Sequence, residues 1–287
     1  MNNNIANWSY LKEVLKSHNF QFRKSLGQNF LIDKNILTQI IDASGVDEYC
    51  ATLEIGAGAG VLTFELAKAT KKVVTIEIDR ALIPILQHNL AEFDNVEIIS
   101  SDILKIDITK LFAEHFAGID VRVAANLPYY ITTPIIMKLL ESSIPNLKSL
   151  TVMVQKEVAA RIAARPGTKD YGALSVAAQY HASIKIVTDV SPHCFMPPPN
   201  VASTVVHLEI LPNKSVTVKN EELFFAIVRA AFGQRRKTLQ NTLTGNVDLQ
   251  FTKDQIITAL TEMEKRHDIR GETLSVEDFA KLTNILS

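Results

Sequence analysis

Residues 54–60 read Glu-Ile-Gly-Ala-Gly-Ala-Gly and connect a β-rich run, residues 52–55, to a helical pattern over residues 61–68. Glycines allow the backbone to turn sharply, and they allow a ligand to approach the main chain closely. A strand, a glycine turn and a helix in this order are typical of an open α/β sheet with a ligand site at the turn. The plain alternative is a strand-to-helix turn that binds nothing.

The segments that follow this turn continue the same alternation. Strands are predicted over residues 73–78, 96–99, 121–124 and 150–154, and helices over residues 81–90 and 135–141. Because parallel strands need helical crossovers, this pattern indicates a mostly parallel sheet with helices on both faces.

The pattern changes later in the chain. Strands are predicted over residues 184–187 and 203–208 with a proline-rich connection instead of a helix, which favours an antiparallel last pair. A linker is expected at residues 211–214, and from Glu222 onward the patterns are helical. We therefore predict one domain over residues 1–212, including an N-terminal helical and basic extension, and a small all-α domain over residues 213–287.

The composition is that of a globular protein with a sizeable core, since 47% of its 287 residues are hydrophobic. No apolar run has membrane-spanning length, and the N-terminus lacks the pattern of a secretory signal. Cys50 and Cys194 lie far apart, and the seven histidines show no ligand spacing. We expect a reduced, cytoplasmic setting with no membrane and no metal.

The charge pattern leaves nucleic-acid binding open. A formal net charge of −1 argues against a chain that is basic all over, but phosphate binding requires only local positive patches. Basic residues cluster at Arg23-Lys24 and at Arg235-Arg236-Lys237. The plain interpretation of either cluster is a solvated face.

The spacing of the glycines suggests the kind of cofactor. Gly56 and Gly58 open a Gly-x-Gly-x-Gly pattern, and Glu77 ends the next predicted strand, 21 positions after Gly56. A carboxylate there can accept both hydroxyl hydrogens of a ribose. A dinucleotide fingerprint would instead read Gly-x-Gly-x-x-Gly and present a helix N-terminus to a pyrophosphate. The pattern found here is similar to that of Rossmann-like S-adenosylmethionine methyltransferases, whose cofactor has no phosphate.

Ser101-Asp102-Ile103 follows the third predicted strand. In a methyltransferase, Asp102 would accept from the exocyclic amine of the cofactor's adenine and Ile103 would donate its backbone N–H. A helix or turn cap is an equally good interpretation of Asp102.

Asn126-Leu127-Pro128-Tyr129 follows a further strand and is expected at the same edge of the sheet as the glycine turn. Asn126 Oδ1 and the Leu127 carbonyl are two acceptors for one amino group, and Tyr129 offers a flat face. These are the requirements for methylating the exocyclic amine of a flipped base, where positioning and electrostatics carry most of the catalysis. Phe195, in the stiff proline-rich connection, could provide a second aromatic wall, or it could be a core anchor beneath that loop.

Seven motifs together resemble the ribosomal RNA adenine N6-dimethyltransferases, the KsgA family, nearly from end to end. They begin at Phe22, Glu54, Asn126, Gln155, Tyr171, Phe195 and Gln234, and read FRKSLGQNFL, EIGAGAG, NLPY, QKEV, YGALS, FMPPP and QRRKT.

The resemblance implies S-adenosylmethionine as the cofactor, with contacts at Asn29, Leu31, Gly56, Glu77, Asp102 and Asn126 and with Gln28 close by. It also implies that Asn126, Leu127 and Tyr129 meet the target adenine, with Phe195 opposite Tyr129. The substrate would be two adjacent adenines in the 3′-terminal hairpin loop of small-subunit (16S) ribosomal RNA in the assembling 30S subunit. Residues 234–238 would face the RNA, and we predict RNA contacts at Arg23, Lys24, Arg235, Arg236 and Lys237. A monomer is expected. Tyr130 is expected to pack against the strand end.

Three other functions compete with this one. A resistance-type methyltransferase of large-subunit (23S) ribosomal RNA shares fold and chemistry, but more often has Ile after the Asn and lacks the motifs at Tyr171 and Gln234. A non-catalytic nucleic-acid-binding relative would show a broken cofactor motif, and none is seen. A dinucleotide-dependent oxidoreductase is disfavoured by the glycine spacing.

Overall fold

The computed structural model describes residues 5–23, 26–142, 144–234 and 236–287. These residues form two compact units, one of Met1–Ala159 and Ile184–Ile210 and one of Ala160–Ser183 and Leu211–Ser287. The second unit thus combines the C-terminal helices with an earlier stretch that we had assigned to the first domain. The boundary between residues 212 and 213 stays a prediction.

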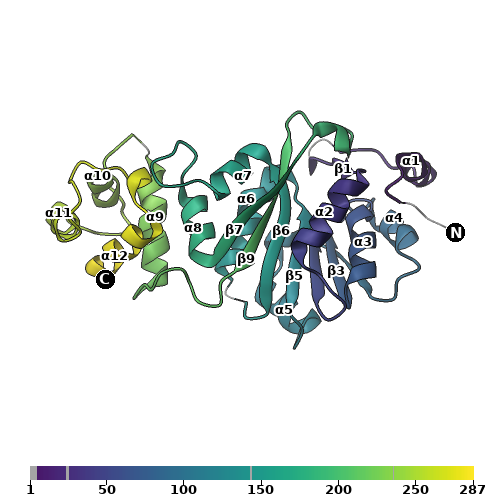
Figure 1. The fold of residues 1–287 in the computed structure, drawn as a ribbon, viewed down its shortest axis with the longest axis horizontal. Coiled ribbons are helices and arrows are strands. Elements are labelled where there is room, and N and C mark those ends of the chain that lie inside the picture. Colours follow the sequence, from purple (N-terminus) through teal and green to yellow (C-terminus); the bar gives the residue numbers. More distant parts are fainter. Residues whose placement is uncertain (1–4, 24–25, 143, 235) are drawn as a thin grey trace. The chain divides into compact units, whose positions relative to one another are not determined.

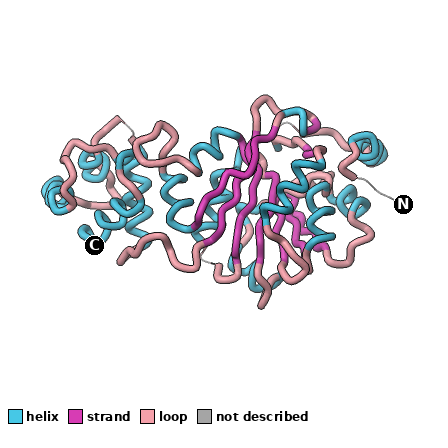
Figure 2. Tube along the Cα trace, in the orientation of Figure 1, coloured by secondary structure: helices cyan, strands magenta, loops and turns pink. Residues whose placement is uncertain are grey.

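The first unit is built on a seven-stranded sheet in the order β4-β3-β2-β5-β6-β9-β7 (Figures 1 and 2). Neighbouring strands from β4 to β6 pair in parallel, and β9 pairs antiparallel with β6, with Val152 opposite Val206. This confirms the predicted mostly parallel sheet with an antiparallel strand. The strands are β2 (Ala51–Ile55), β3 (Lys72–Glu77), β4 (Val96–Ser100), β5 (Val121–Asn126), β6 (Leu147–Gln155), β7 (Ala182–Val190) and β9 (Ser203–Ile210).

Capping residues mark the ends of helices in this unit, as α2 shows. Asp33 caps α2 by accepting the backbone N–H of Asn35 and Ile36, and Gly45 ends that helix with a φ of 62°. The helical elements are α1 (Trp8–Ser17), α2 (Lys34–Ser44), α3 (Val61–Ala69), α4 (Ile83–Asn89), η2 (Ile103–Lys105), α5 (Ile108–His115), η3 (Tyr129–Ile131), α6 (Thr132–Glu141), α7 (Lys156–Ile162) and η4 (Pro192–Cys194).

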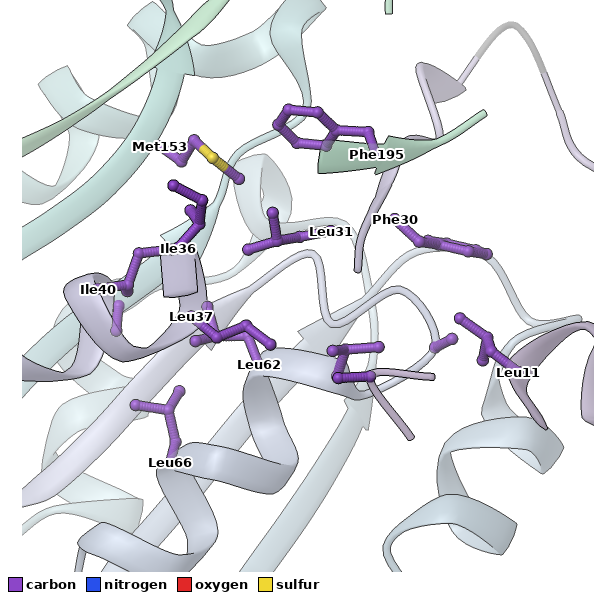
Figure 3. Packing of buried hydrophobic residues seen from close by; sticks show 14 of the residues in the cluster. Leu11, Phe30, Leu31, Ile36, Leu37, Ile40, Leu62, Leu66, Met153 and Phe195 are labelled. Atoms are coloured by element: carbon purple, nitrogen blue, oxygen red, sulfur yellow. The ribbon is translucent and has the colours of Figure 1, made fainter. Parts of the chain in front are cut away.

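A second, two-stranded sheet pairs β1 (Phe30–Leu31) with β8 (Phe195–Met196) in an antiparallel manner. These short strands and α1 join the core that α2 and α3 form with the large sheet (Figure 3). Burying these apolar side chains stabilises the N-terminal extension on the domain. The residues labelled in this core are Leu11, Phe30, Leu31, Ile36, Leu37, Ile40, Leu62, Leu66, Met153 and Phe195.

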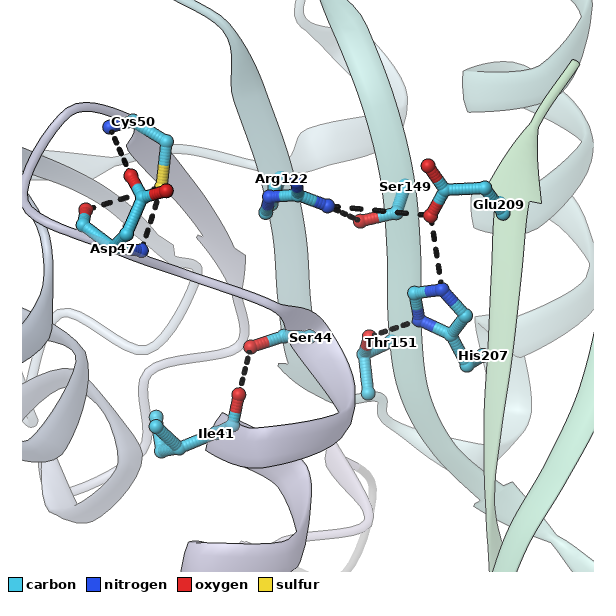
Figure 4. Close-up of polar contacts among 9 residues, drawn as sticks. All are labelled: Ile41, Ser44, Asp47, Cys50, Arg122, Ser149, Thr151, His207 and Glu209. Atoms are coloured by element: carbon cyan, nitrogen blue, oxygen red, sulfur yellow. Dashed lines mark hydrogen bonds and ion pairs between the residues drawn. The ribbon is translucent and has the colours of Figure 1, made fainter.

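A polar network ties the antiparallel strand to its parallel neighbours (Figure 4). Arg122 on β5 donates to Ser149 Oγ at 3.3 Å, and its guanidinium lies 4.0 Å from Glu209 Oε2 on β9. His207 contacts Thr151 Oγ1 at 2.8 Å and Glu209 at 3.1 Å. Arg122 and Ser149 lie near the amino ends of β5 and β6, so the Arg122 end of this network belongs to the sheet end opposite the glycine turn.

The second unit is helical in the residues that the structure describes. Its helices are α8 (Ala173–His181), α9 (Glu221–Gly233), α10 (Leu239–Thr244), α11 (Lys253–Glu262) and α12 (Val276–Leu286), with η5 (Gly271–Thr273) beside α9. Phe224, Leu260 and Phe279 are fully buried in it, and capping boxes at Thr252 and Ser275 start α11 and α12. The prediction of a helical C-terminal part is confirmed.

Candidate active site

An open pocket lies where the carboxyl ends of β2, β3 and β5 and the segment after β4 meet residues 26–31 of the N-terminal extension. This is the edge of a parallel sheet at which ligands bind in open α/β folds. Its wall contains all nine predicted cofactor-binding residues, namely Gln28, Asn29, Leu31, Gly56, Gly58, Glu77, Asp102, Ile103 and Asn126, together with Leu127 and Tyr129, which were predicted to meet the target adenine.

The glycine turn forms the floor of the pocket. Gly56 and Gly58 have φ values of 79° and 59°, which only glycine adopts without strain. A Cβ on Gly58 would lie 3.1 Å from the Phe30 ring, and one on Gly56 would lie 3.3 Å from Pro128 Cδ. Phe30 of the N-terminal extension and Pro128, which follows β5, therefore pack tightly against the turn, and both glycines line the pocket.

Glu77 is held rigidly at the end of β3. Its Oε2 accepts the Gly58 N–H at 2.8 Å, and its Oε1 accepts the Asp79 N–H at 2.8 Å. Burial raises the pKa of Glu77, and the nearby charge of Asp79 raises it further. Two backbone donors thus orient a carboxylate that is 5% exposed toward the pocket.

Asp102 caps η2, since its Oδ1 accepts the Leu104 N–H at 3.0 Å. The cap that we considered as an alternative role is therefore present. The other oxygen, Oδ2, accepts no hydrogen bond from the residues that the structure describes. Asp102 can therefore cap η2 with Oδ1 and contact a ligand with Oδ2 at the same time. Ile103 is 4% exposed and lines the pocket beside it.

Asn126 ends β5 with its amide already oriented. Its Nδ2 donates to the Asn29 carbonyl at 3.1 Å, whereas its Oδ1 accepts no hydrogen bond from the described part of the chain. Leu127 donates its N–H to the Met153 carbonyl at 3.1 Å, and its own carbonyl is likewise uncommitted within the described residues. The Tyr129 hydroxyl lies 2.6 Å from Ser203 Oγ.

The match with known proteins covers nearly the whole chain. The family model described as Ribosomal RNA adenine dimethylase matches residues 19–285. This chain belongs to the ribosomal RNA adenine dimethylase family.

Relatives in this dimethylase family are similar over most of their length. A protein of Alkaliphilus oremlandii named Ribosomal RNA small subunit methyltransferase A is 50% identical over 277 residues, which are 96% of either chain. A Bacillus pumilus protein of the same name is 50% identical over 100% of this chain and 98% of its own. A crystal structure of a dimethyladenosine transferase from Plasmodium falciparum is 28% identical with a TM-score of 0.73, over 87% of this chain and 94% of that one.

Phe195 does not line the pocket of this dimethylase family member. Its side chain is 1% exposed and packs in the core cluster with Leu31 and Met153 (Figure 3). The predicted aromatic wall opposite Tyr129 is therefore absent from this conformation. The physical reason is the β1–β8 pairing, which places Phe195 beside Leu31 and lets its ring gain the full free energy of burial.

Tyr130 corrects a second prediction. We expected it to pack against the strand end, but its side chain is 51% exposed and lines the pocket. Burial raises the pKa of its phenol, and the negative charges of Asp102 and Glu77 raise it further. Tyr130 therefore lies on the rim of the dimethylase pocket, on the side of the two acids.

The basic residues differ in their surroundings. Arg23 pairs with Asp79 at 3.2 Å, whereas Arg236 and Lys237 are exposed just before α10. The other two predicted RNA-binding residues, Lys24 and Arg235, lie outside the described residues.

Two buried acids at this site, Glu54 and Asp79, were not predicted as site residues. Glu54 is 1% exposed and its Oε2 accepts from the Thr63 and Thr75 hydroxyls, the latter at 2.8 Å. Asp79 is 0% exposed and holds the N-terminal extension. The available signals were an acid inside an apolar strand and a second acid two residues after Glu77.

Among the described residues, no group of three or more His, Cys, Asp or Glu side chains is arranged to hold a metal ion, and the expectation of no metal stays a prediction. No described helix is both long and apolar enough to cross a membrane.

Proposed function

We propose that this protein transfers methyl groups from S-adenosylmethionine to N6 of two adjacent adenines in the 3′-terminal hairpin loop of small-subunit (16S) ribosomal RNA. The products are N6,N6-dimethyladenosines and S-adenosylhomocysteine, made during late assembly of the 30S subunit. This proposal depends on the orientation of the Asn126 side chain. Its Nδ2 donates to the Asn29 carbonyl, so its Oδ1 can accept a hydrogen bond from a ligand in the pocket. Membership of the dimethylase family and the small-subunit names of its relatives support the substrate.

The pocket residues fit the cofactor. When bound, S-adenosylmethionine supplies an electrophilic methyl group on a sulfonium. Glu77 would accept from the ribose hydroxyls, and Asp102 with the Ile103 N–H would bind the adenine. The absence of a Cβ at Gly56 and Gly58 lets Pro128 and Phe30 pack directly against the turn that lines the pocket. Gln28, Asn29 and Leu31 would close the pocket from the N-terminal side.

Asn126 and Leu127 would position the target amine. The N6 lone pair of adenine is delocalised into the ring, so the nitrogen is a weak nucleophile. Asn126 Oδ1 and the Leu127 carbonyl would accept its two hydrogens and favour a more tetrahedral nitrogen with its lone pair toward the methyl group. As the new C–N bond forms, the S–C bond breaks, and the cationic amine then loses a proton to water. Preorganised acceptors of this kind stabilise the charge that develops on nitrogen.

Two aromatic side chains would hold the flipped base. Tyr129 would stack on it, which offsets part of the cost of unstacking, and such stacking is worth roughly 1–3 kcal/mol per base. Phe195 would have to leave the core cluster, so its proposed role opposite Tyr129 requires β8 to shift when RNA binds. RNA contacts would come from Arg23 and Lys24 in the first unit and, separately, from Arg235, Arg236 and Lys237 in the second. The protein would act as a cytoplasmic monomer without a membrane partner.

The direct test uses tritiated S-adenosylmethionine with unmethylated small subunits. Label is expected in dimethyladenosine near the 3′ end of the small-subunit RNA. Label only in large-subunit RNA would replace the proposal with the resistance-type function. Cofactor binding without transfer to either RNA would indicate a non-catalytic nucleic-acid-binding protein.

A further inference from the structure

Asp79 is a fully buried carboxylate just past the end of β3, and the proposed reaction assigns it no role. Its side chain is 0% exposed. Its Oδ1 accepts the Ala81 N–H at 3.1 Å, which is a local turn contact. A buried charge is costly unless it is paired and hydrogen-bonded, so the remaining partners of Asp79 indicate what this carboxylate does.

Both remaining partners come from the N-terminal extension. Gln28 Nε2 donates to Asp79 Oδ2 at 2.7 Å, and the Arg23 guanidinium lies 3.2 Å from Oδ1. Gln28 Oε1 in turn accepts a hydrogen bond from the backbone N–H of Arg23 at 2.7 Å. The three residues thus form a closed network, and a segment about fifty residues away in the sequence satisfies the buried carboxylate (Gln28 and Asp79 are 51 positions apart).

The segment held in this way is part of the pocket. We call residues 26–31 the clasp, and all six line the pocket. The end of the clasp that carries Phe30 and Leu31 is fixed by β1–β8 pairing, and the Phe30 ring packs on Gly58. The end near Gln28 is fixed by Asp79. Asn29 lies between these two anchors, and its backbone carbonyl accepts a hydrogen bond from the Asn126 side-chain amide.

We propose that Asp79, acting through Arg23 and Gln28, is a positioning residue that holds the clasp against the pocket and thereby sets the affinity for S-adenosylmethionine before any RNA binds. This inference rests on the proposed function. It gives Arg23 an intramolecular task in addition to its predicted contact with RNA. The two acids at the end of β3 thus have different roles. Glu77 faces the ligand, and Asp79 holds the clasp.

The expected effect follows from the population of closed clasps. The apparent dissociation constant rises as the fraction of molecules with a closed clasp falls. Because the Arg23 side chain is 58% exposed, its ion pair is partly screened by solvent. We expect Arg23→Ala or Asp79→Asn to weaken S-adenosylmethionine binding roughly three- to tenfold.

The experiment measures the binding of S-adenosylmethionine to full-length, RNA-free protein by calorimetry. The variants are Arg23→Ala, Arg23→Lys, Asp79→Asn and the Arg23→Ala/Asp79→Asn double variant. Lys148→Ala is the matched control, because it removes a half-exposed basic partner of another ion pair, to Asp120 at 3.3 Å. Cleavage within residues 26–31 by a protease at low concentration reports clasp opening, and thermal unfolding reports the global fold.

We expect Arg23→Ala and Asp79→Asn to weaken cofactor binding and speed clasp cleavage, while Arg23→Lys recovers part of the affinity and Lys148→Ala matches wild type. The double variant should bind about as well as Asp79→Asn alone, since removing the buried charge removes the need for Arg23. The KM for the cofactor should rise in Arg23→Ala and Asp79→Asn, and Arg23→Lys should reverse part of the rise.

An unchanged cofactor affinity in folded Arg23→Ala protein would overturn the inference. If that variant also binds RNA more weakly, Arg23 is an RNA contact only. Arg23→Ala keeps the test decisive where Asp79→Asn does not fold, because Arg23 is largely exposed. Wild-type protein that binds no S-adenosylmethionine would overturn the proposed function and this inference together.

Discussion

The Asn126 side chain donates to the backbone carbonyl of Asn29 at 3.1 Å, across 97 positions of sequence. This bond commits the nitrogen of the amide and leaves its oxygen for the pocket. The acceptor that the proposed chemistry requires is therefore oriented before substrate arrives.

Asn126→Ala should reduce methyl transfer by about a hundredfold or more, because it removes one of the two acceptors for the target amine. Transfer of tritium to unmethylated small subunits measures this. Asn95→Ala is the matched control, since that amide donates to the Ala67 and Thr70 carbonyls away from the pocket. The control should lose stability but keep activity at temperatures where it is folded. Undiminished transfer by folded Asn126→Ala would remove Asn126 from the mechanism.

Tyr129→Ala should weaken productive RNA binding by roughly 1–3 kcal/mol, the worth of one base stacked on an aromatic ring. Tyr129→Phe keeps the ring and loses only the contact with Ser203 Oγ at 2.6 Å, so it should stay close to wild type. The ratio kcat/KM for RNA measures both. Equal losses in the two variants would indicate that the hydroxyl contact matters and that the ring does not.

Tyr130→Ala should weaken cofactor binding a few-fold without lowering the melting temperature, because a ring that is 51% exposed contributes little to the core. The ring lies on the rim beside Glu77 and Asp102 and would shield the bound adenosine from water. Tyr130→Phe should bind like wild type. Calorimetry measures the affinities, and an unchanged Tyr130→Ala affinity would contradict a role at the rim.

Gly58→Ala should lower the free energy of unfolding by about 1–3 kcal/mol and weaken cofactor binding, since a positive φ and a crowded Cβ act together. The added Cβ would meet Phe30 at 3.1 Å, which pushes on the clasp. Gly118→Ala is the control, because Gly118 has a φ of 73° and a Cβ added there would meet no described atom within 4 Å. It should show backbone strain alone. Equal destabilisation by both variants in urea would rule out the contact with Phe30.

The buried Glu54 carboxyl should make the free energy of unfolding depend on pH. Burial raises the pKa of Glu54 from 4.5 to about 7. The folded state then binds more protons than the unfolded state between these values, so the contribution of Glu54 to stability falls as pH rises from 4.5 to 7 and is constant outside this window. Glu54→Gln removes this slope. It should gain on the order of 3 kcal/mol over wild type between pH 4.5 and pH 8.

Urea unfolding of wild type and Glu54→Gln at several pH values measures the difference, in which the contributions of other acids cancel. Glu97→Gln is the control, because the His115 and Lys72 contacts lower the pKa of that half-buried carboxyl. Its contribution should change with pH in the opposite direction. A constant difference between Glu54→Gln and wild type across the range would show that Glu54 does not titrate there.

Much of the fold and of the cofactor side of the site follows from local sequence. The runs before Gly56 and at Glu77 predicted their strands because strand and helix periods are set by residues close together in the chain. Gly56, Gly58, Glu77 and Asp102 could be placed at one edge because the carboxyl ends of parallel strands meet there. The family resemblance added the residues of the N-terminal extension.

Packing between distant segments decided the rest. The sequence by itself determined which residue types stand at the ends of the strands, and therefore the class of ligand they suit. Only the tertiary structure placed Phe195 in the core rather than on the pocket wall, Tyr130 on the rim rather than against a strand, and Arg23 on the buried Asp79. The physical reason is that burial and charge pairing depend on which segments come together in space, and local sequence patterns carry no information about partners fifty or a hundred residues away.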